Sequence, residues 1–222
     1  MFVMLMASNF MRYNGSFGDW LYVKILMLPG IVIGLSFHEA AHGYMSYWLG
    51  DPTPKIQGRM TLNPAAHFDP YGLVSLLLVG FGWGRPVQVN PMYYKHRRRD
   101  EILVSLAGVV TNFLIALITS FIIKACMAHM SVSFYDGIGQ HILQILIYVF
   151  AVNIMLMVFN LIPVPPLDGF GILTQIFNLE KYDWYWNFYH KGGIILMFLL
   201  IFGVTSTIIN PCYEFFVRLL LA

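Results

Sequence analysis

The sequence predicts an all-α polytopic membrane protein. Of its 222 residues, 58% are hydrophobic and only 11% are charged, and the mean hydropathy is +0.67, well above that of an ordinary soluble domain. Apolar runs of roughly 20 residues, the length that an α-helix needs to cross a bilayer, recur along the chain. We therefore expect a single membrane-embedded domain over residues 1–222. It should have about four to six transmembrane helices and a short re-entrant or β-strand segment near the functional site.

The elements follow from the apolar runs. A fifth apolar segment, Tyr71–Trp83, is short and contains glycines, so a short span, a re-entrant segment and a helix running into a strand all stay open. The overlapping segment Phe81–Pro91 alternates Val87 and Val89 with polar residues, which is compatible with a strand. The four stronger candidates for spanning helices are Trp20–Leu49, Ile102–His129, Ile142–Val164 and Gly192–Leu221.

Charge distribution predicts how the chain sits in the cell membrane. Basic residues cluster in Lys95–Arg99, and basic loop residues are retained on the cytoplasmic side. The connector Met130–Gln140 contains no Lys or Arg and is expected outside, so that Asp168 returns to the cytoplasmic side. The basic cluster is expected to anchor the chain at lipid headgroups rather than to bind substrate. No basic stripe interleaved with aromatic residues exists, so a nucleic-acid partner is not indicated.

The motif HEAAH lies inside the first apolar segment. In a helix His38 and His42 are one turn apart on one face, about 5–6 Å between Cβ atoms, so both imidazoles can reach one Zn²⁺ at roughly 2.0–2.1 Å. In such motifs the intervening glutamate, here Glu39, is the general base for a metal-activated water. Ionisable groups within a membrane segment are costly. Three of them together therefore favour a metal site over buried structural side chains.

Catalytic zinc keeps three protein ligands and leaves a fourth position open, so a third ligand is needed. Cys126 and Cys212 are far apart in apolar segments, and a thiolate ligand is not indicated. The best-placed acid is Asp168, which follows three prolines that break the preceding helix. Gly169 then permits a turn. By itself Asp168 would be interpreted as a helix N-cap; the unpartnered histidine pair favours a ligand.

These motifs resemble those of the site-2 protease family of intramembrane zinc metalloproteases, in the short form without a PDZ domain. The resemblance implies that His38, His42 and Asp168 bind one Zn²⁺ per chain and that Glu39 is the base. Val109 and Phe170 depart from the family pattern, which often has proline and a small residue there. The matching stretches, in family order, are HEAAH (38–42), GRMTLNPAAHFDPYG (58–72), LAGVVTN (106–112) and NLIPVPPLDG (160–169).

The expected function is zinc-dependent hydrolysis of peptide bonds in or near transmembrane segments of other membrane proteins, through a zinc-activated water and the Glu39 base. Its expected partners are these substrates and the lipid bilayer. A regulatory membrane protein and the oligomeric state stay open. The alternatives are a metal transporter, which should show further intramembrane acids and histidines, and a non-catalytic relative, against which the presence of Glu39 speaks.

Three more polar residues are candidates for the site. Asn112 and Asn160 lie in apolar segments, where each amide needs partners. Each either bonds a neighbouring helix or binds the substrate backbone and the oxyanion, and the family motifs favour the latter, more so for Asn160. His67, beside Asp69, is either a second-shell partner of the metal site or an exposed loop residue.

Overall fold

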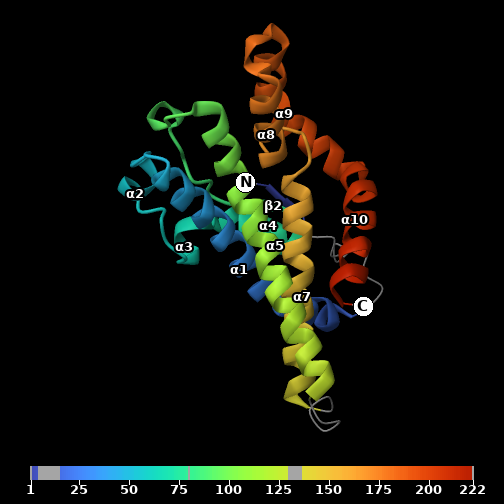
Figure 1. Ribbon diagram of the computed structural model, residues 1–222. Coiled ribbons are helices and arrows are strands. Elements are labelled where there is room, and N and C mark those ends of the chain that lie inside the picture. The colour runs from blue at the N-terminus through green and yellow to red at the C-terminus, as the bar shows by residue number, and fades with distance from the viewer. Residues whose placement is uncertain (1, 5–15, 80, 130–136, 222) are drawn as a thin grey trace.

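The computed structural model describes residues 2–4, 16–79, 81–129 and 137–221 (Figure 1). Its described part is almost entirely helical, as predicted. The elements, in chain order, are β1 (Phe2–Met4), α1 (Phe17–Trp48), α2 (Thr53–Ile56), α3 (Pro64–His67), α4 (Pro70–Val79), β2 (Phe81–Trp83), the 3-10 turn η2 (Pro91–Tyr93), α5 (Arg97–His129), α7 (Ile138–Asn160), α8 (Asp168–Phe177), the 3-10 turn η3 (Leu179–Lys181), α9 (Asp183–Ile201) and α10 (Val204–Leu221).

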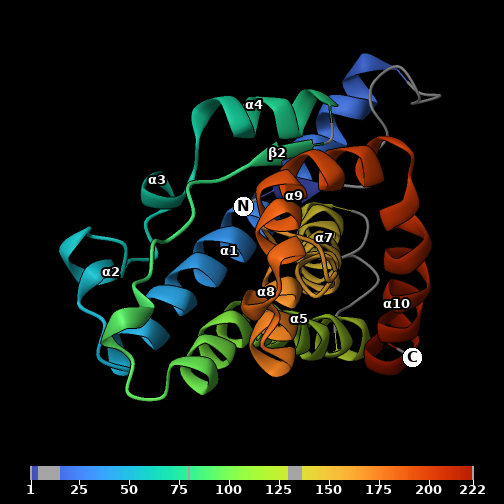
Figure 2. The same cartoon turned by 90° about the horizontal axis from the view of Figure 1, so that it is seen from above.

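Helices α1, α5 and α7 form the centre of the molecule. Each is long and apolar enough to cross a membrane, and the three pack pairwise against one another. Helices α5 and α7 run side by side while α1 crosses them at an angle (Figures 1 and 2). The fully buried side chains of Ile31, Phe150 and Ile154 belong to the apolar core of the molecule. Three of the four predicted spans are thereby confirmed.

The ends of these helices differ from the predicted ones for local reasons. Helix α1 starts at Phe17 because Ser16 and Asp19 form a capping box, in which side chain and backbone satisfy each other. Helix α5 starts at Arg97, so part of the basic cluster lies in its first turn and not in a loop. The connector Met130–Gln140 falls mostly on residues 130–136, which lie outside the described part of the chain.

The fourth predicted span, Gly192–Leu221, is not one straight helix. It falls on α9 and α10, which are bent by 71° at a short break. Gly203 has φ +71 at that break, a conformation that glycine adopts at little cost. The described chain therefore contains three candidate spans, or four if the bent pair is one span, which makes it a multi-pass membrane protein.

The ambiguous segment Tyr71–Trp83 is a helix running into a strand. Helix α4 leads into β2, which pairs antiparallel with β1. Gly72 and Gly82 lie backbone against backbone, where a side chain would not fit. The strand predicted over Phe81–Pro91 is confined to its first three residues. Residues 84–90, which we call the strap, then run without a sheet ladder toward η2 (Figure 2).

Hydrogen bonds fix the strap near both of its ends. At one end the Arg85 amide donates to the carbonyl oxygen of His67 at 2.7 Å. At the other end the Asn90 amide donates to Oδ2 of Asp51, also at 2.7 Å. Asp51 is fully buried and also accepts from the Ser46 hydroxyl at 2.7 Å. The strap is thus tied to α3 and to the C-terminal end of α1.

Candidate metal centre

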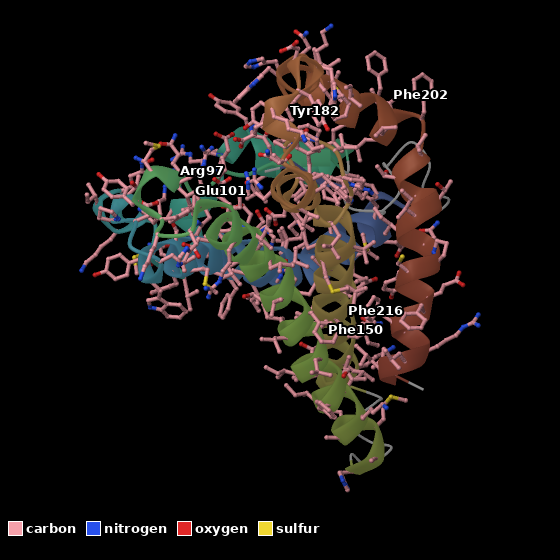
Figure 3. All side chains as sticks on the ribbon, turned by 45° about the horizontal axis from the view of Figure 1, so that its top comes forward. Arg97, Glu101, Phe150, Tyr182, Phe202 and Phe216 are labelled. Carbon is pink, nitrogen blue, oxygen red and sulfur yellow. The ribbon has the colours of Figure 1, made fainter. Side chains whose placement is uncertain are left out.

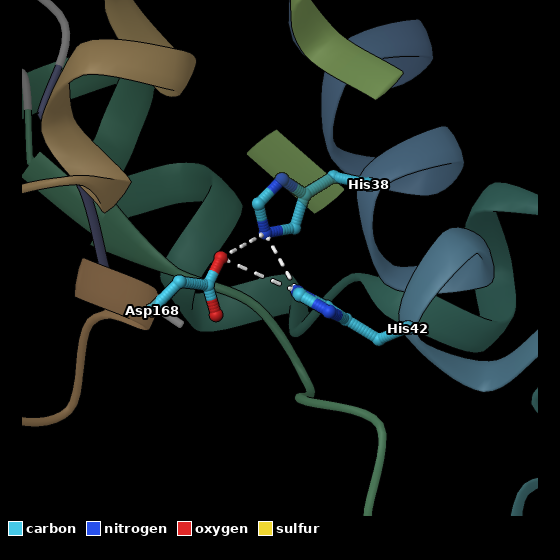
Figure 4. A group of neighbouring side chains, drawn as sticks. All are labelled: His38, His42 and Asp168. Carbon is cyan, nitrogen blue, oxygen red and sulfur yellow. Dashed lines mark hydrogen bonds and ion pairs between the residues drawn. The ribbon is translucent and has the colours of Figure 1, made fainter. Parts of the chain in front are cut away.

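Two helices far apart in the sequence bring three polar side chains to one point. His38 and His42 project from α1, and Asp168 is the first residue of α8. The Oδ2 atom of Asp168 lies 3.2 Å from His38 Nε2 and 3.4 Å from His42 Nε2. The two Nε2 atoms are 3.0 Å apart. Figure 4 shows both imidazoles and the carboxylate facing a common centre.

Each imidazole is held by its other nitrogen. The Nδ1 atom of His42 lies 2.7 Å from the carbonyl oxygen of Val104, which can only accept, so Nδ1 carries the proton. The Nδ1 atom of His38 is 2.6 Å from Oδ1 of Asn112. Both rings therefore direct an Nε2 lone pair toward the centre, as neutral metal-binding histidines do.

The partner of His38 is itself fixed in a buried chain of amides. The Nδ2 atom of Asn112 donates to the carbonyl oxygen of Gly34 at 3.1 Å and to Oδ1 of Asn153 at 2.9 Å. Asn153 in turn donates to the carbonyl oxygen of Val149 at 2.8 Å. This chain links α1, α5 and α7 and leaves Oδ1 of Asn112 as the atom that faces His38.

Small residues let the helices approach this closely. A Cβ atom placed on Gly108 would lie 2.5 Å from Cε1 of His38, so α5 contacts the imidazole through backbone alone. A Cβ on Gly169 would collide with the backbone of Leu161. The start of α8 is therefore packed directly on the turn that follows α7. That contact sets where Asp168 enters the site.

The donor set fits zinc. A tetrahedral Zn²⁺ with bonds of roughly 2.0–2.1 Å separates its ligand atoms by about 3.3–3.4 Å, close to the distances of 3.0, 3.2 and 3.4 Å found here. Oδ2 of Asp168 is buried without a hydrogen bond, a state that a metal ion would relieve.

The three side chains line a cleft of about 710 Å³. Glu39 lines this cleft and is 4% exposed; its Oε2 accepts a hydrogen bond of 2.8 Å from the Val87 amide. Further lining residues belong to the strap and to α5, α8, η3 and α9.

A polar network spans part of the cleft rim. Nε of Arg97 donates to Oε1 of Glu101 at 2.8 Å, and its Nη2 lies 3.2 Å from Oε2 of Glu180. The Gln175 side chain donates to Oε2 of Glu101 at 2.6 Å. Figure 3 shows Arg97 and Glu101 together at the start of α5. These contacts join α5 to the end of α8 and to η3.

Comparison with known proteins gives this arrangement a family. The chain is 41% identical over 164 residues to a Bacillus subtilis protein named "Putative zinc metalloprotease YwhC", an alignment that covers 71% of this chain and 73% of that protein. The chain belongs to the site-2 protease family. Membership assigns the metal cluster to a zinc metalloprotease fold and agrees with the resemblance seen in the sequence motifs.

Further family members are more distant. "Putative zinc metalloprotease Rip2" of Mycolicibacterium smegmatis is 29% identical over 71% of this chain and 60% of its own length. Rip2 of Mycobacterium tuberculosis H37Rv is 26% identical over 68% of the chain and 57% of its own length. No protein-family model and no solved structure matches the sequence.

Some of the predicted site residues line the cleft in the structure, and others do not. Glu39 and Asn160 line the cleft together with the three metal-facing residues. Asn112 lies behind His38, with its amide engaged on both sides. His67 is buried, but its Nε2 contacts the carbonyl oxygen of Thr61 at 2.7 Å. Among the described residues it contacts none of the metal-facing side chains and does not line the cleft.

Sequence reasoning missed three contributors. Asn153 carried a usable signal, since it is a polar residue inside a predicted span. Gly108 carried a weaker one, as a small residue in a motif shared with Asn112. The amide of Val87 carried no signal in the sequence, because every residue except proline has a backbone amide. Only the path of the strap brings this amide to Glu39.

Proposed function

We propose that this protein is an intramembrane protease that uses one Zn²⁺ per chain to hydrolyse peptide bonds in or near transmembrane segments of other membrane proteins. The observation that supports this best is the position of the cluster. His38 and His42 project from a helix long and apolar enough to span a bilayer, and their Nε2 atoms converge with Asp168 in the lining of a cleft.

The residues of the cleft have distinct tasks. Zinc, when bound, would supply a Lewis acid that polarises the scissile carbonyl and lowers the pKa of an attacking water toward about 7. Glu39 takes the proton of that water and returns it to the leaving amine. The Asn160 side chain, whose Nδ2 donates to the carbonyl oxygen of Leu156 at 2.8 Å, lines the cleft beside the metal-facing residues. It is the candidate for binding the substrate backbone.

Asn112 is best assigned to holding His38, because its amide is completely buried and bonded. The basic residues at the start of α5 favour a cytoplasmic position for that end of the helix. The cleft rim includes Arg97 and Glu101 and lies at the same end. We therefore place the opening of the site toward the cytoplasm.

A substrate helix must unwind before a peptide bond can be attacked, because its backbone is shielded by its own hydrogen bonds. The strap offers a place for the unwound segment. Val87 and Val89 line the cleft. In an extended chain their amides point to the same side, and among the described residues the amide of Val89 donates no hydrogen bond. A substrate strand can therefore pair with the strap at Val89, in the manner of strand addition.

The pairing is tested by replacing Val89 with Pro, which removes the amide donor while the preceding residue keeps an extended backbone. We expect cleavage to fall at least tenfold with the zinc content unchanged. Val89→Ala keeps the amide, is the matched control and should retain most of the wild-type cleavage. Full activity of Val89→Pro would exclude pairing at this residue.

Two competing functions make different demands. A metal transporter needs a series of ionisable groups along its path, but the described residues contain a single cluster of metal-binding type, at His38, His42 and Asp168. A non-catalytic relative would have no use for a buried acid next to the first ligand. Glu39 is present and lines the cleft.

The deciding experiment measures zinc and cleavage on the same purified protein in liposomes, with single-span reporter proteins as substrates. Wild type should contain about one zinc per chain, and His38→Ala and Asp168→Ala should lose it. Glu39→Gln should keep its zinc and lose cleavage by a factor of roughly 10²–10⁴. A folded wild type without zinc, or strong cleavage by Glu39→Gln, would contradict the proposal.

A further inference from the structure

The carboxylate of Glu39 has a backbone partner from a distant part of the chain. Its Oε2 accepts a 2.8 Å hydrogen bond from the amide of Val87, 48 residues further on. Glu39 is almost completely buried, and hydrogen bonds to a buried carboxylate are among the stronger ones. The contact is therefore strong enough to decide the orientation of this side chain.

The direction of the Val87 amide is fixed by the strap rather than by Glu39. In an extended chain, backbone amides two residues apart point to the same side. The Arg85 amide points to the His67 carbonyl oxygen, and that of Val87 points to Glu39. With Asn90 tied to Asp51 at the far end, the strap presents the Val87 amide to the site whether or not Glu39 is there.

A base needs this support. Helix α1 fixes only the backbone of Glu39, and its side chain has three rotatable bonds, each with several accessible rotamers. A general base must lie within about 2.6–3.2 Å of the proton it takes. One oxygen held by the strap leaves the other to exchange the proton.

We propose that the backbone amide of Val87 is the positioning group for the Glu39 base, so that the strap controls the catalytic rate as well as lining the cleft. This inference rests on the proposed function, in which Glu39 is the base. It separates two roles within the strap. Val87 serves the base, and Val89 serves the substrate.

The test removes only the N–H group. The α-hydroxy analogue of valine, incorporated at position 87 of the full chain, replaces the amide with an ester and keeps the side chain. The ester at position 88, made with the α-hydroxy analogue of glutamine, is the control, because the Gln88 amide points to the other side of the strap and among the described residues donates no hydrogen bond. We expect kcat to fall at least tenfold for the ester at position 87, with KM and zinc content unchanged, and to stay near the wild-type value for the ester at position 88.

The second half of the experiment places the position-87 ester in the Glu39→Gln variant. If the amide acts through the Glu39 carboxylate, the ester should reduce the residual kcat of that variant by less than twofold. An unchanged kcat in the wild-type background, or an equal tenfold loss in both backgrounds, would overturn the inference. Strong cleavage by Glu39→Gln alone would instead refute the proposed role of Glu39, so the two failures are distinguishable.

Discussion

Replacing Gly108 with Ala should empty the metal site without unfolding the protein. The added methyl carbon would lie 2.5 Å from Cε1 and 2.7 Å from both ring nitrogens of His38, whereas ordinary van der Waals contact begins at 3.4 Å. The imidazole must therefore retreat by about 0.9 Å, several times the roughly 0.2 Å tolerance of a zinc–ligand distance. The 2.6 Å hydrogen bond between Nδ1 of His38 and Oδ1 of Asn112 prevents the imidazole from moving sideways to avoid the added methyl group.

The assay is zinc affinity, measured by competition with a chelator on purified protein, together with thermal unfolding. Loss of an outer partner alone costs about 10–100-fold in metal affinity, and displacement of a ligand should cost more. We therefore expect at least a hundredfold weaker zinc binding. Stability of the zinc-free protein should fall only modestly, because Ala favours a helix over Gly by up to about 1 kcal/mol.

The matched control is Gly193→Ala in α9, where an added Cβ would meet nothing within 4 Å. It should bind zinc like the wild type. If Gly108→Ala also bound zinc with wild-type affinity, the close packing of α5 on His38 would not be what fixes the ligand, and the reasoning would be refuted.

Two further predictions follow from the surroundings of the site. Asn112→Leu leaves Nδ1 of His38 without an acceptor, so zinc affinity by chelator competition should fall about 10–100-fold; wild-type affinity would contradict the role of Asn112. At Asp51, burial raises the pKa, but donors including the Asn90 amide outweigh it, and the net pKa is lowered. A carboxyl group whose pKa is lower in the folded protein than in the unfolded chain, where it is about 3.9, stabilises the fold at pH values above this unfolded-state pKa. This stabilisation is lost as the pH falls through the folded-state pKa. The excess thermal stability of wild type over Asp51→Asn at pH 7 should therefore shrink below about pH 4; a pH-independent difference would exclude this linkage.

Much of the fold could be predicted from the sequence because membrane spans depend on composition averaged over many residues. Helices α1, α5 and α7 follow directly from apolar length. The break between α9 and α10 could not be predicted from averaged composition, because the segment is apolar on both sides of it. The break depends on the conformation of one residue, Gly203. A glycine in an apolar segment is tolerated in many helices and carries no sign of its φ angle.

The candidate site also contains residues that could be predicted from the sequence and residues that could not. His38, Glu39 and His42 share one helix turn, so their spacing alone indicates a metal site, and Asp168 was the best-placed acid in apolar context. The neighbours of these residues depend on tertiary packing. The placement of Asn112 behind His38, and that of His67 under the strap, depends on how α5 and α3 meet α1, which no local pattern encodes.

The split origin of the metal cluster has a consequence for biosynthesis. Two of its residues emerge from the ribosome with α1, but the third is residue 168 of 222, so about three quarters of the chain must be translated before the cluster can be completed. The amides that hold His38 arrive in between, on α5 and α7. Under the proposed function, a nascent chain inserting into the membrane therefore has no complete metal site until Asp168 has been made.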